Sequence, residues 1–234
     1  TQGVSSAASD VYKRQDKLRA MRRRRHFISA GLAFGLLGTW TATSAWAAET
    51  GPLLVLGDSL SAEYGLARGT GWVALLQKRL QESPKNVPLV NASVSGETTS
   101  GGRSRLPALL KQHKPSVVVI ELGGNDALRG LPLQSTQGNL DAMVRAARDA
   151  GAKVLLVGMQ VPPNYGSGYT RQFEQLFAKV AQEQKVPLVP FLLAGIGDAA
   201  DSAQWFQADR IHPTAKAQPR MLDNVWPQLS KLLP

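Results

Sequence analysis

The chain of 234 residues contains no cysteine. Disulfide bonds, thiolate metal sites and a cysteine nucleophile are therefore excluded. Histidine is also scarce, so each of the three histidines can be weighed separately as an acid–base group. The apolar content of 43% is ordinary for a globular protein and too high for a disordered one.

Negative charge is under-represented, and the formal net charge is +10. Much of this excess lies in residues 1–47, which hold eight Lys and Arg against two Asp. The remaining residues have 19 basic and 15 acidic side chains, a balance of +4. Because that balance is unremarkable, the sequence predicts no nucleic-acid partner.

Residues 21–47 have the three parts of a secretory signal peptide. Residues 21–26 are mostly arginine, residues 27–40 are mainly apolar and small, and residues 45–47 form a small-x-small cleavage site. We therefore expect cleavage after Ala47, which implies a periplasmic or secreted bacterial protein.

The mature chain is then expected to be a single domain over residues 48–234. A retained membrane anchor is an alternative for the apolar stretch. Twin-arginine export, suggested by Arg24 and Arg25, is an alternative route to the same location. Residues 1–20 lack periodicity and are expected to be a non-native leader.

Short apolar runs alternate with amphipathic stretches after the signal peptide. The runs predict strands at residues 53–56, 88–91, 117–120, 154–157 and 187–189. Helical spacing of apolar residues predicts helices over 72–80, 106–113, 140–147, 173–180 and 222–232. This alternation predicts a three-layer α/β/α sandwich around a mostly parallel five-stranded sheet. Ligands bind beyond the carboxyl ends of such strands.

The segment Gly57-Asp58-Ser59-Leu60-Ser61 directly follows the first predicted strand. A serine in a strand-to-helix turn is exposed at the sheet edge, where it can act as a nucleophile. The usual esterase motif Gly-x-Ser-x-Gly does not occur in the chain. Ser and Asp are equally typical of a helix N-cap, so this segment alone leaves both interpretations open.

Asp209 and His212 lie three positions apart near the end of the chain. This spacing can bring carboxylate and imidazole together, so that Asp209 holds the tautomer in which His212 accepts a serine proton. A structural histidine before Pro213 is the alternative. His113 ends a predicted helix and is expected to be a solvated surface residue.

Two glycine-containing segments follow the third and the second predicted strand. In Gly123-Gly124-Asn125-Asp126, the Asn125 amide is a donor for a developing oxyanion. In the segment 91–97, Gly96 offers an unobstructed backbone N–H. Both segments are also typical of ordinary turns.

Together these segments stand in the order of the four blocks of the GDSL, or SGNH, hydrolases, which the chain resembles from residue 53 to residue 233. It is most similar to a branch of bacterial periplasmic enzymes described as thioesterases, arylesterases and lysophospholipases. The segments that carry this closer resemblance are Asn91-Ala-Ser, Arg105-Leu-Pro-Ala-Leu-Leu110, Glu121-Leu-Gly-Gly-Asn-Asp126, Leu128-Arg-Gly130, Pro163-Asn-Tyr-Gly166 and Ala217-Gln-Pro219.

The resemblance implies the flavodoxin-like fold of that family and a role for each motif residue. Ser59 would be the nucleophile, His212 the general base and then acid, and Asp209 its orienting partner. The N–H groups of Ser59 and Gly96 and the Asn125 amide would form the oxyanion hole. The substrate would be a small-molecule ester or thioester, with no metal or cofactor. A monomer with transient contact to membrane lipids is expected.

The branch also implies a mobile loop over residues 127–132 that closes over the acyl chain. The side chains expected to bind the substrate are Leu128, Leu131, Pro132, Val161, Pro162 and Tyr165. The sequence departs from the branch at Ala127 and Arg210, where Gly is usual, and at Glu97, where Asp is commoner. Arg210 places a cation near Asp209 and bears on the pH optimum.

The sequence leaves three alternatives, the first of which is also an esterase. An acetyl-carbohydrate deacetylase has the same fold, but the apolar loop residues disfavour a sugar site. A non-catalytic binding protein for acyl groups or lysolipids would not need the complete set of motif residues. Finally, residues 195–200 match Gly-x-Gly-x-x-Ala, but too late in the chain for a dinucleotide-binding motif.

Overall fold

The computed structural model describes residues 51–84, 86–161 and 165–234. The expected leader, the signal peptide and its cleavage site lie outside these residues, as does Pro162. Within the described part of the chain, no helix is both long and apolar enough to cross a membrane.

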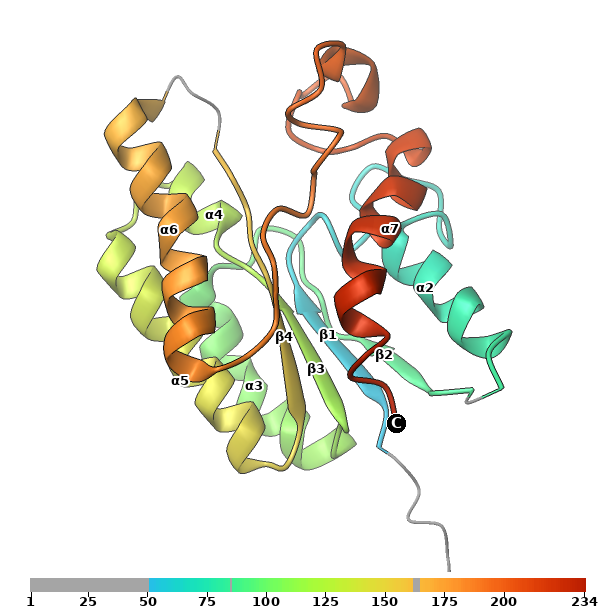
Figure 1. Ribbon diagram of the computed structural model, residues 1–234. Coiled ribbons are helices and arrows are strands. Elements are labelled where there is room, and N and C mark those ends of the chain that lie inside the picture. Colours follow the sequence, from blue (N-terminus) through green and yellow to red (C-terminus); the bar gives the residue numbers. More distant parts are fainter. Residues whose placement is uncertain (1–50, 85, 162–164) are drawn as a thin grey trace, which may run out of the picture. The chain divides into compact units, whose positions relative to one another are not determined.

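A five-stranded sheet forms the centre of the fold (Figure 1). Its strands are β1 (Leu53–Gly57), β2 (Leu89–Asn91), β3 (Val117–Glu121), β4 (Lys153–Val157) and β5 (Leu188–Val189). Their order is β2-β1-β3-β4-β5, and every neighbouring pair is parallel. The five predicted strands are thus confirmed.

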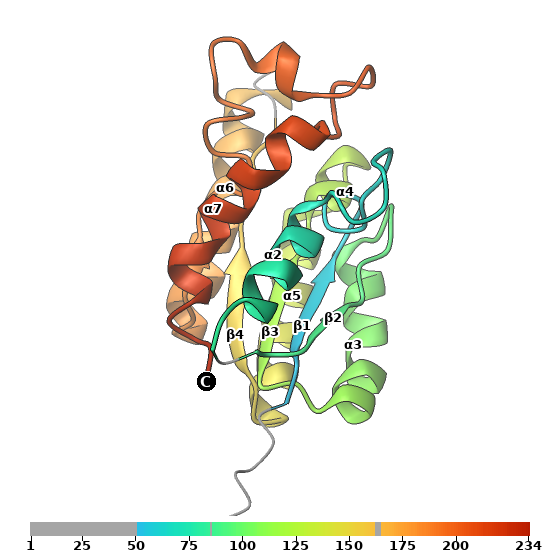
Figure 2. The same cartoon turned by 90° about the vertical axis from the view of Figure 1, so that its right-hand side faces the viewer.

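Helices cover both faces of this sheet, which confirms the three layers (Figures 1 and 2). One face carries α2 (Trp72–Gln81) and α7 (Gln218–Leu229). The other carries α3 (Thr99–His113), α5 (Leu133–Asp149) and α6 (Ser167–Gln184). The central strands β1 and β3 are buried along their whole length, which explains why they are continuous apolar runs.

The alternating side chains of β1 serve both layers. Leu53 and Val55 pack with α2 and α7, whereas Leu54 and Leu56 pack with α3 and α5. Two cores therefore hold β1 rigidly from both sides. The residues directly after β1 are therefore anchored to a rigid strand.

Helix α3 begins seven residues earlier than predicted. The side chain of Thr98 caps it by accepting a hydrogen bond from the N–H of Gly101, 3.2 Å away. Two glycines in the first turn and Pro107 inside the helix obscure the helical pattern in the sequence. The tertiary contacts of Leu106 and Leu110 outweigh these weak propensities.

Three short elements were not predicted from the sequence: the helix α4 (Gly124–Leu128) and the 3₁₀ turns η3 (Ser202–Trp205) and η4 (Ala215–Ala217). The helix N-cap interpretation of the segment after β1 is wrong. Residues 59–65 form successive turns, and α2 begins only at Trp72.

Candidate active site

The four candidate segments meet at the carboxyl edge of the sheet. Ser59 follows β1, Gly96 follows β2, Asn125 lies in α4 just after β3, and His212 lies in the loop between η3 and η4. These residues share a cavity of about 360 Å³. Its lining consists of Asp58, Ser59, Leu60, Tyr64, Ser95, Gly96, Gly124, Asn125, Leu128, Met159, Ile211 and His212.

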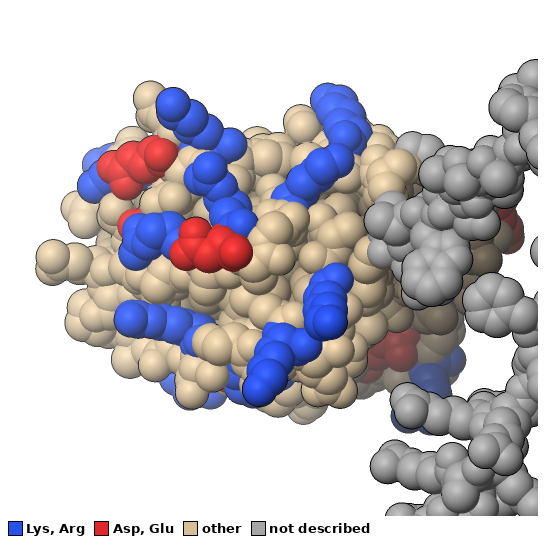
Figure 3. Space-filling model, turned by 90° about the horizontal axis from the view of Figure 1, so that it is seen from below, with Lys and Arg blue, Asp and Glu red and all other residues tan. Residues whose placement is uncertain are grey.

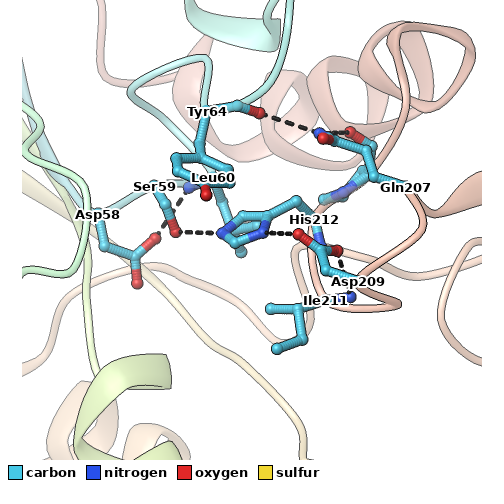
Figure 4. Close-up of polar contacts among 9 residues, drawn as sticks. Asp58, Ser59, Leu60, Tyr64, Gln207, Asp209, Ile211 and His212 are labelled. Carbon is cyan, nitrogen blue, oxygen red and sulfur yellow. Dashed lines mark hydrogen bonds and ion pairs between the residues drawn. The ribbon is translucent and has the colours of Figure 1, made fainter.

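Ser59, His212 and Asp209 form one continuous hydrogen-bonded chain (Figure 4). The Ser59 Oγ lies 2.9 Å from Nε2 of His212, although 153 residues separate them in the sequence. On the other side of the ring, Nδ1 lies 2.7 Å from Oδ2 of Asp209. With Nδ1 protonated, Nε2 is free to accept the serine proton, which is the arrangement that general-base catalysis requires.

Asp209 is held by its own turn. Its Oδ1 accepts hydrogen bonds from the backbone N–H groups of Ile211 (2.9 Å) and His212 (3.0 Å). These hydrogen bonds lower the pKa of Asp209 to about 2, and the N–H of His212 makes the largest contribution. Between Asp209 and Ile211, Arg210 adopts the left-handed conformation, with φ of +57°, in which glycine is the unstrained residue. The turn therefore keeps Asp209 ionised and aimed at the imidazole.

The candidate oxyanion donors line the same cavity as the Ser59 side chain. Gly96 has φ of +78°, a conformation that a side chain would strain. Its carbonyl oxygen accepts a hydrogen bond of 2.7 Å from Nη2 of Arg129, at the end of α4. This contact links the Gly96 loop to α4, the helix that contains Asn125.

Comparison with known proteins agrees with this geometry. Residues 55–219, which include every candidate motif residue, match the model of the GDSL-like Lipase/Acylhydrolase family. The chain belongs to this family. The resemblance inferred from the motif residues is thereby confirmed.

Among curated relatives of this GDSL-like hydrolase, the esterase TesA of Pseudomonas aeruginosa is 52% identical, over 86% of the chain and 98% of the relative. The thioesterase 1/protease 1/lysophospholipase L1 of Escherichia coli K12 is 43% identical, over 80% and 87%. A crystal structure of TesA matches with a TM-score of 0.74 and 54% identity, covering 78% of this chain and 99% of that one.

Two buried carboxyl groups lie beneath the Ser59 turn of this GDSL-like hydrolase. Asp58 is 2% exposed, and burial raises its pKa to about 6. Glu121, at the end of β3, is 3% exposed, and burial together with the Asp58 charge raises its pKa well above the usual range. The sequence alone identifies neither as a site residue, because a carboxylate at a strand end is usually solvated.

Glu121 anchors the turn through its Oε2 atom. That oxygen accepts hydrogen bonds from the Ser61 hydroxyl (2.7 Å) and the Asp58 N–H (3.3 Å). The indole N–H of Trp72 donates in turn to Ser61, at 3.2 Å. A Cβ atom on Gly57 would lie 2.8 Å from the same oxygen, which explains why glycine begins the motif.

The predicted substrate contacts are distributed differently from the expectation. Leu128 lines the cavity, whereas the described residues Leu131, Pro132, Val161 and Tyr165 are not part of its lining. Val161 instead packs into the core beside α5 and α6. The N–H of Leu131 bonds back to the carbonyl of Asp126, which turns the chain after α4 into the start of α5.

The cavity wall instead includes Tyr64, Met159 and Ile211. The Tyr64 ring lies over the imidazole of His212, with 4.2 Å between the ring centroids. None of the three belongs to a periodic apolar pattern, so the sequence carried no signal for them. These three residues reach the cavity wall because folding brings together turns that are far apart in the sequence.

The remaining candidate residues lie away from this cavity. His113 is the last residue of α3, at the opposite edge of the sheet. Residues 195–200 form turns and are not followed directly by an α-helix, so the dinucleotide-binding interpretation is wrong. In the described ranges, no cluster of three or more His, Asp or Glu could hold a metal ion.

Proposed function

We propose that this GDSL-like hydrolase is a serine esterase and thioesterase that hydrolyses acyl esters and thioesters through an acyl-enzyme on Ser59. The observation that carries the proposal is the unbroken chain from Ser59 through His212 to Asp209 at the wall of a cavity. Hydrolysis of ester bonds is the activity of the family, and the names of the close relatives agree with it.

In the acylation step, His212 Nε2 takes the proton of the Ser59 hydroxyl while Oγ attacks the acyl carbon. Asp209 stabilises the imidazolium that forms. The carbonyl oxygen becomes negative and receives hydrogen bonds from the N–H groups of Ser59 and Gly96 and from the Asn125 amide. The bond to the leaving group then breaks, and the imidazolium gives its proton to the departing alcohol or thiol.

Deacylation repeats these steps with water as the nucleophile. His212 takes one proton from the water, whose oxygen attacks the acyl carbon of the ester on Ser59. When the tetrahedral species collapses, the carboxylic acid leaves and Ser59 regains its proton from His212. The proposed mechanism needs neither a metal ion nor a cofactor.

The apolar wall of the cavity favours an acyl chain over a sugar. Leu60, Leu128, Met159 and Ile211 contribute side chains that cannot hydrogen-bond to hydroxyl groups. We therefore propose that the substrates carry medium or long acyl chains, as in aryl esters, acyl-CoA and lysophospholipids, and are not acetylated carbohydrates. Alanine substitution tests the predicted substrate-binding role of Leu131, Pro132, Val161, Pro162 and Tyr165: a raised KM for long-chain esters would support it.

Location and contacts with lipid follow from the same proposal. We infer that residues 21–47 direct export, that residues 48–234 are the mature monomer, and that it acts in the periplasm or outside the cell. Exposed apolar side chains of Tyr64, Leu128 and Ile211 surround the cavity and suit transient contact with lipids. The opposite end, seen in Figure 3, carries mainly Lys and Arg among its charged residues.

The test is hydrolysis of p-nitrophenyl esters from acetyl to palmitoyl by the wild type, Ser59→Ala and Ser61→Ala. Ser61 is the matched control, because it lies two residues away but is only 1% exposed and bonds to Glu121. We expect wild-type activity to rise toward longer chains and Ser59→Ala to lose at least ~10³-fold in kcat. Ser61→Ala should remain active.

Other results would lead to other conclusions. Activity confined to acetyl esters would support the deacetylase. Equal activity of Ser59→Ala and the wild type would contradict the proposed nucleophile. Binding of acyl compounds without hydrolysis by the wild type would support the non-catalytic alternative.

A further inference from the structure

The carboxylate of Asp58 joins two groups that the proposed mechanism uses. Its Oδ2 accepts a hydrogen bond of 3.0 Å from Nδ2 of Asn125, across 67 residues of sequence. Its Oδ1 accepts one of 3.0 Å from the N–H of Leu60, next to Ser59. The side chain is nine-tenths or more buried, so water does not replace these contacts.

We propose that Asp58 is a positioning residue whose ionised carboxylate fixes the side-chain amide of Asn125 with its N–H₂ group toward the oxyanion hole. The inference rests on the proposed function, since it assigns Asp58 a role in stabilising the same oxyanion. The nucleophile and the acid–base pair do not depend on it.

An amide side chain has two chemically different ends. Asn125 can present either its N–H₂ group or its carbonyl oxygen to a neighbour. An ionised carboxylate only accepts hydrogen bonds, so it binds the N–H₂ group and repels the oxygen. One N–H of Asn125 is then bound to Asp58, and the other remains available to the substrate oxygen.

Rotation of the amide by half a turn would reverse this arrangement. The oxygen of Asn125 would then occupy the place of the donor and would repel the developing negative charge. A neutral group in place of the Asp58 carboxylate can donate as well as accept, and therefore permits the reversed amide. The ionised carboxylate is thus specific for the productive orientation.

The charged groups around Asp58 bear on its protonation. Burial opposes its charge, and Asp126 opposes it through space, whereas the hydrogen bonds from Leu60 and Asn125 and the nearby His212 favour it. Glu121 lies closest along β3, where its Oε2 accepts from the Asp58 N–H. Burial favours the neutral form of Glu121, which leaves Asp58 as the carboxylate that can carry the charge.

The test uses the full chain, a p-nitrophenyl ester that the wild type hydrolyses, and five variants, one of which is Ser59→Ala. Asp58→Asn keeps the shape of the side chain but introduces a hydrogen-bond donor. We expect kcat to fall ~10- to 100-fold with KM changed less than ~3-fold, because the hole acts in the transition state. Asp223→Asn is the matched control: it makes the same change in an aspartate of α7 that bonds to Arg79 and is not part of the cavity lining, and it should keep kcat within ~3-fold.

A double-mutant cycle separates positioning from a general structural effect. Asn125→Ala removes the amide through which Asp58 acts. In that background, Asp58→Asn should lower kcat no further, since its target is gone. If the fold losses of kcat from the two substitutions multiply in the double variant, the proposal is overturned. An unchanged kcat in Asp58→Asn alone would also overturn it.

The pH profile gives a second, independent readout. Protonation of Asp58 removes the one-sided acceptor in the wild type, so it contributes one proton to the acid limb of kcat. Because the protonated form should be about as active as Asp58→Asn, kcat of the wild type should lose a further ~10- to 100-fold as the pH falls through the pKa of Asp58, about 6, and Asp58→Asn should lack this loss. The same pH dependence in both proteins would overturn the proposal. Full activity of Ser59→Ala would instead reject the proposed function, so the two failures are distinguishable.

Discussion

Asp58 and Asp209 belong to the same candidate site, yet the structure gives them opposite environments. Asp58 lies beneath the end of β1, where burial raises its pKa to about 6. Asp209 lies in an exposed loop, where the N–H groups of His212 and Ile211 lower its pKa to about 2. One carboxyl is forced toward neutrality by the core, and the other is kept charged by its own backbone.

The partners of the two residues differ in the same way. Asp58 is bound to a residue 67 positions away, and Glu121 reaches back 60 and 63 positions to the Ser59 turn. The hydrogen bonds of Asp209 span only two or three positions. The nucleophile side of the site therefore depends on the packed core, whereas the base side is a local turn. Substitutions on the base side should therefore lower activity with little change in stability, whereas substitutions on the nucleophile side should change both.

The largest effect is expected on the loop side. Replacing His212 by alanine removes the base, and kcat should fall by ~10³- to 10⁴-fold or more. The free energy of unfolding should change by less than ~1 kcal/mol, because the loop contributes little to the core. Ester hydrolysis and urea denaturation of the same preparation measure both quantities. A large loss of stability would show that the loop is not an independent turn.

Asp209→Asn should have the next largest effect. The amide can no longer hold the Nδ1–H tautomer of His212, so kcat should fall ~10²- to 10⁴-fold. Asparagine still accepts from the N–H groups of Ile211 and His212, but it lacks the charge that these groups stabilise. The fold should therefore lose a little stability near pH 7, and only a little because Asp209 is exposed to solvent. A kcat within tenfold of the wild type would show that the turn orients His212 without the charge.

Acid should act in opposite directions on the two sides. The folded pKa of Asp58, about 6, lies above the ordinary aspartate value of 3.8, so the native state binds this proton more tightly. The cost of burying the charge is present above pH 6 and disappears as the pH falls toward 3.8. For Asp209 the folded pKa of about 2 is lower, and its contribution is lost only as the pH falls from about 4 through 2.

Asp58→Asn should therefore stabilise the protein by ~1–3 kcal/mol at pH 8 and by less at pH 5. The measurement is the urea midpoint of both proteins at the two pH values. The same substitution is expected to reduce kcat, so stability and activity would move in opposite directions. A variant that is less stable at pH 8 than at pH 5, relative to the wild type, would contradict the raised pKa.

The pairing of Asp209 with His212 was predictable from the sequence, as was Ser59 as the candidate nucleophile, whereas the two buried carboxyl groups beneath Ser59 were not. Asp209 and His212 are three residues apart, so their contact follows from spacing alone. The strands were also evident, because residues such as those of β3 form apolar runs bounded by turn residues. The role of Asp58 and the burial of Glu121 follow from the register of β1 beside β3, which pairs Gly57 with Glu121.

The cavity wall was difficult to predict for the same reason. Leu131 and Val161 are apolar and lie near motif residues in sequence, but the turn after α4 and the core beside α6 take them elsewhere. Tyr64 lies five residues after Ser59 without any periodic signal, and successive turns bring its ring onto His212. Proximity in sequence predicts contacts within a turn and fails where the chain reverses.

The smallest effect is expected for Arg210→Gly, which tests how far the loop side depends on its backbone. Glycine relieves a left-handed conformation that costs about 1 kcal/mol but loses a similar amount through the entropy of the unfolded chain. Stability should therefore change by less than ~0.5 kcal/mol. The acid limb of kcat should also stay in place, because backbone N–H groups and His212, not the arginine, lower the pKa of Asp209. A shifted limb would assign the guanidinium a part in the electrostatics of the turn.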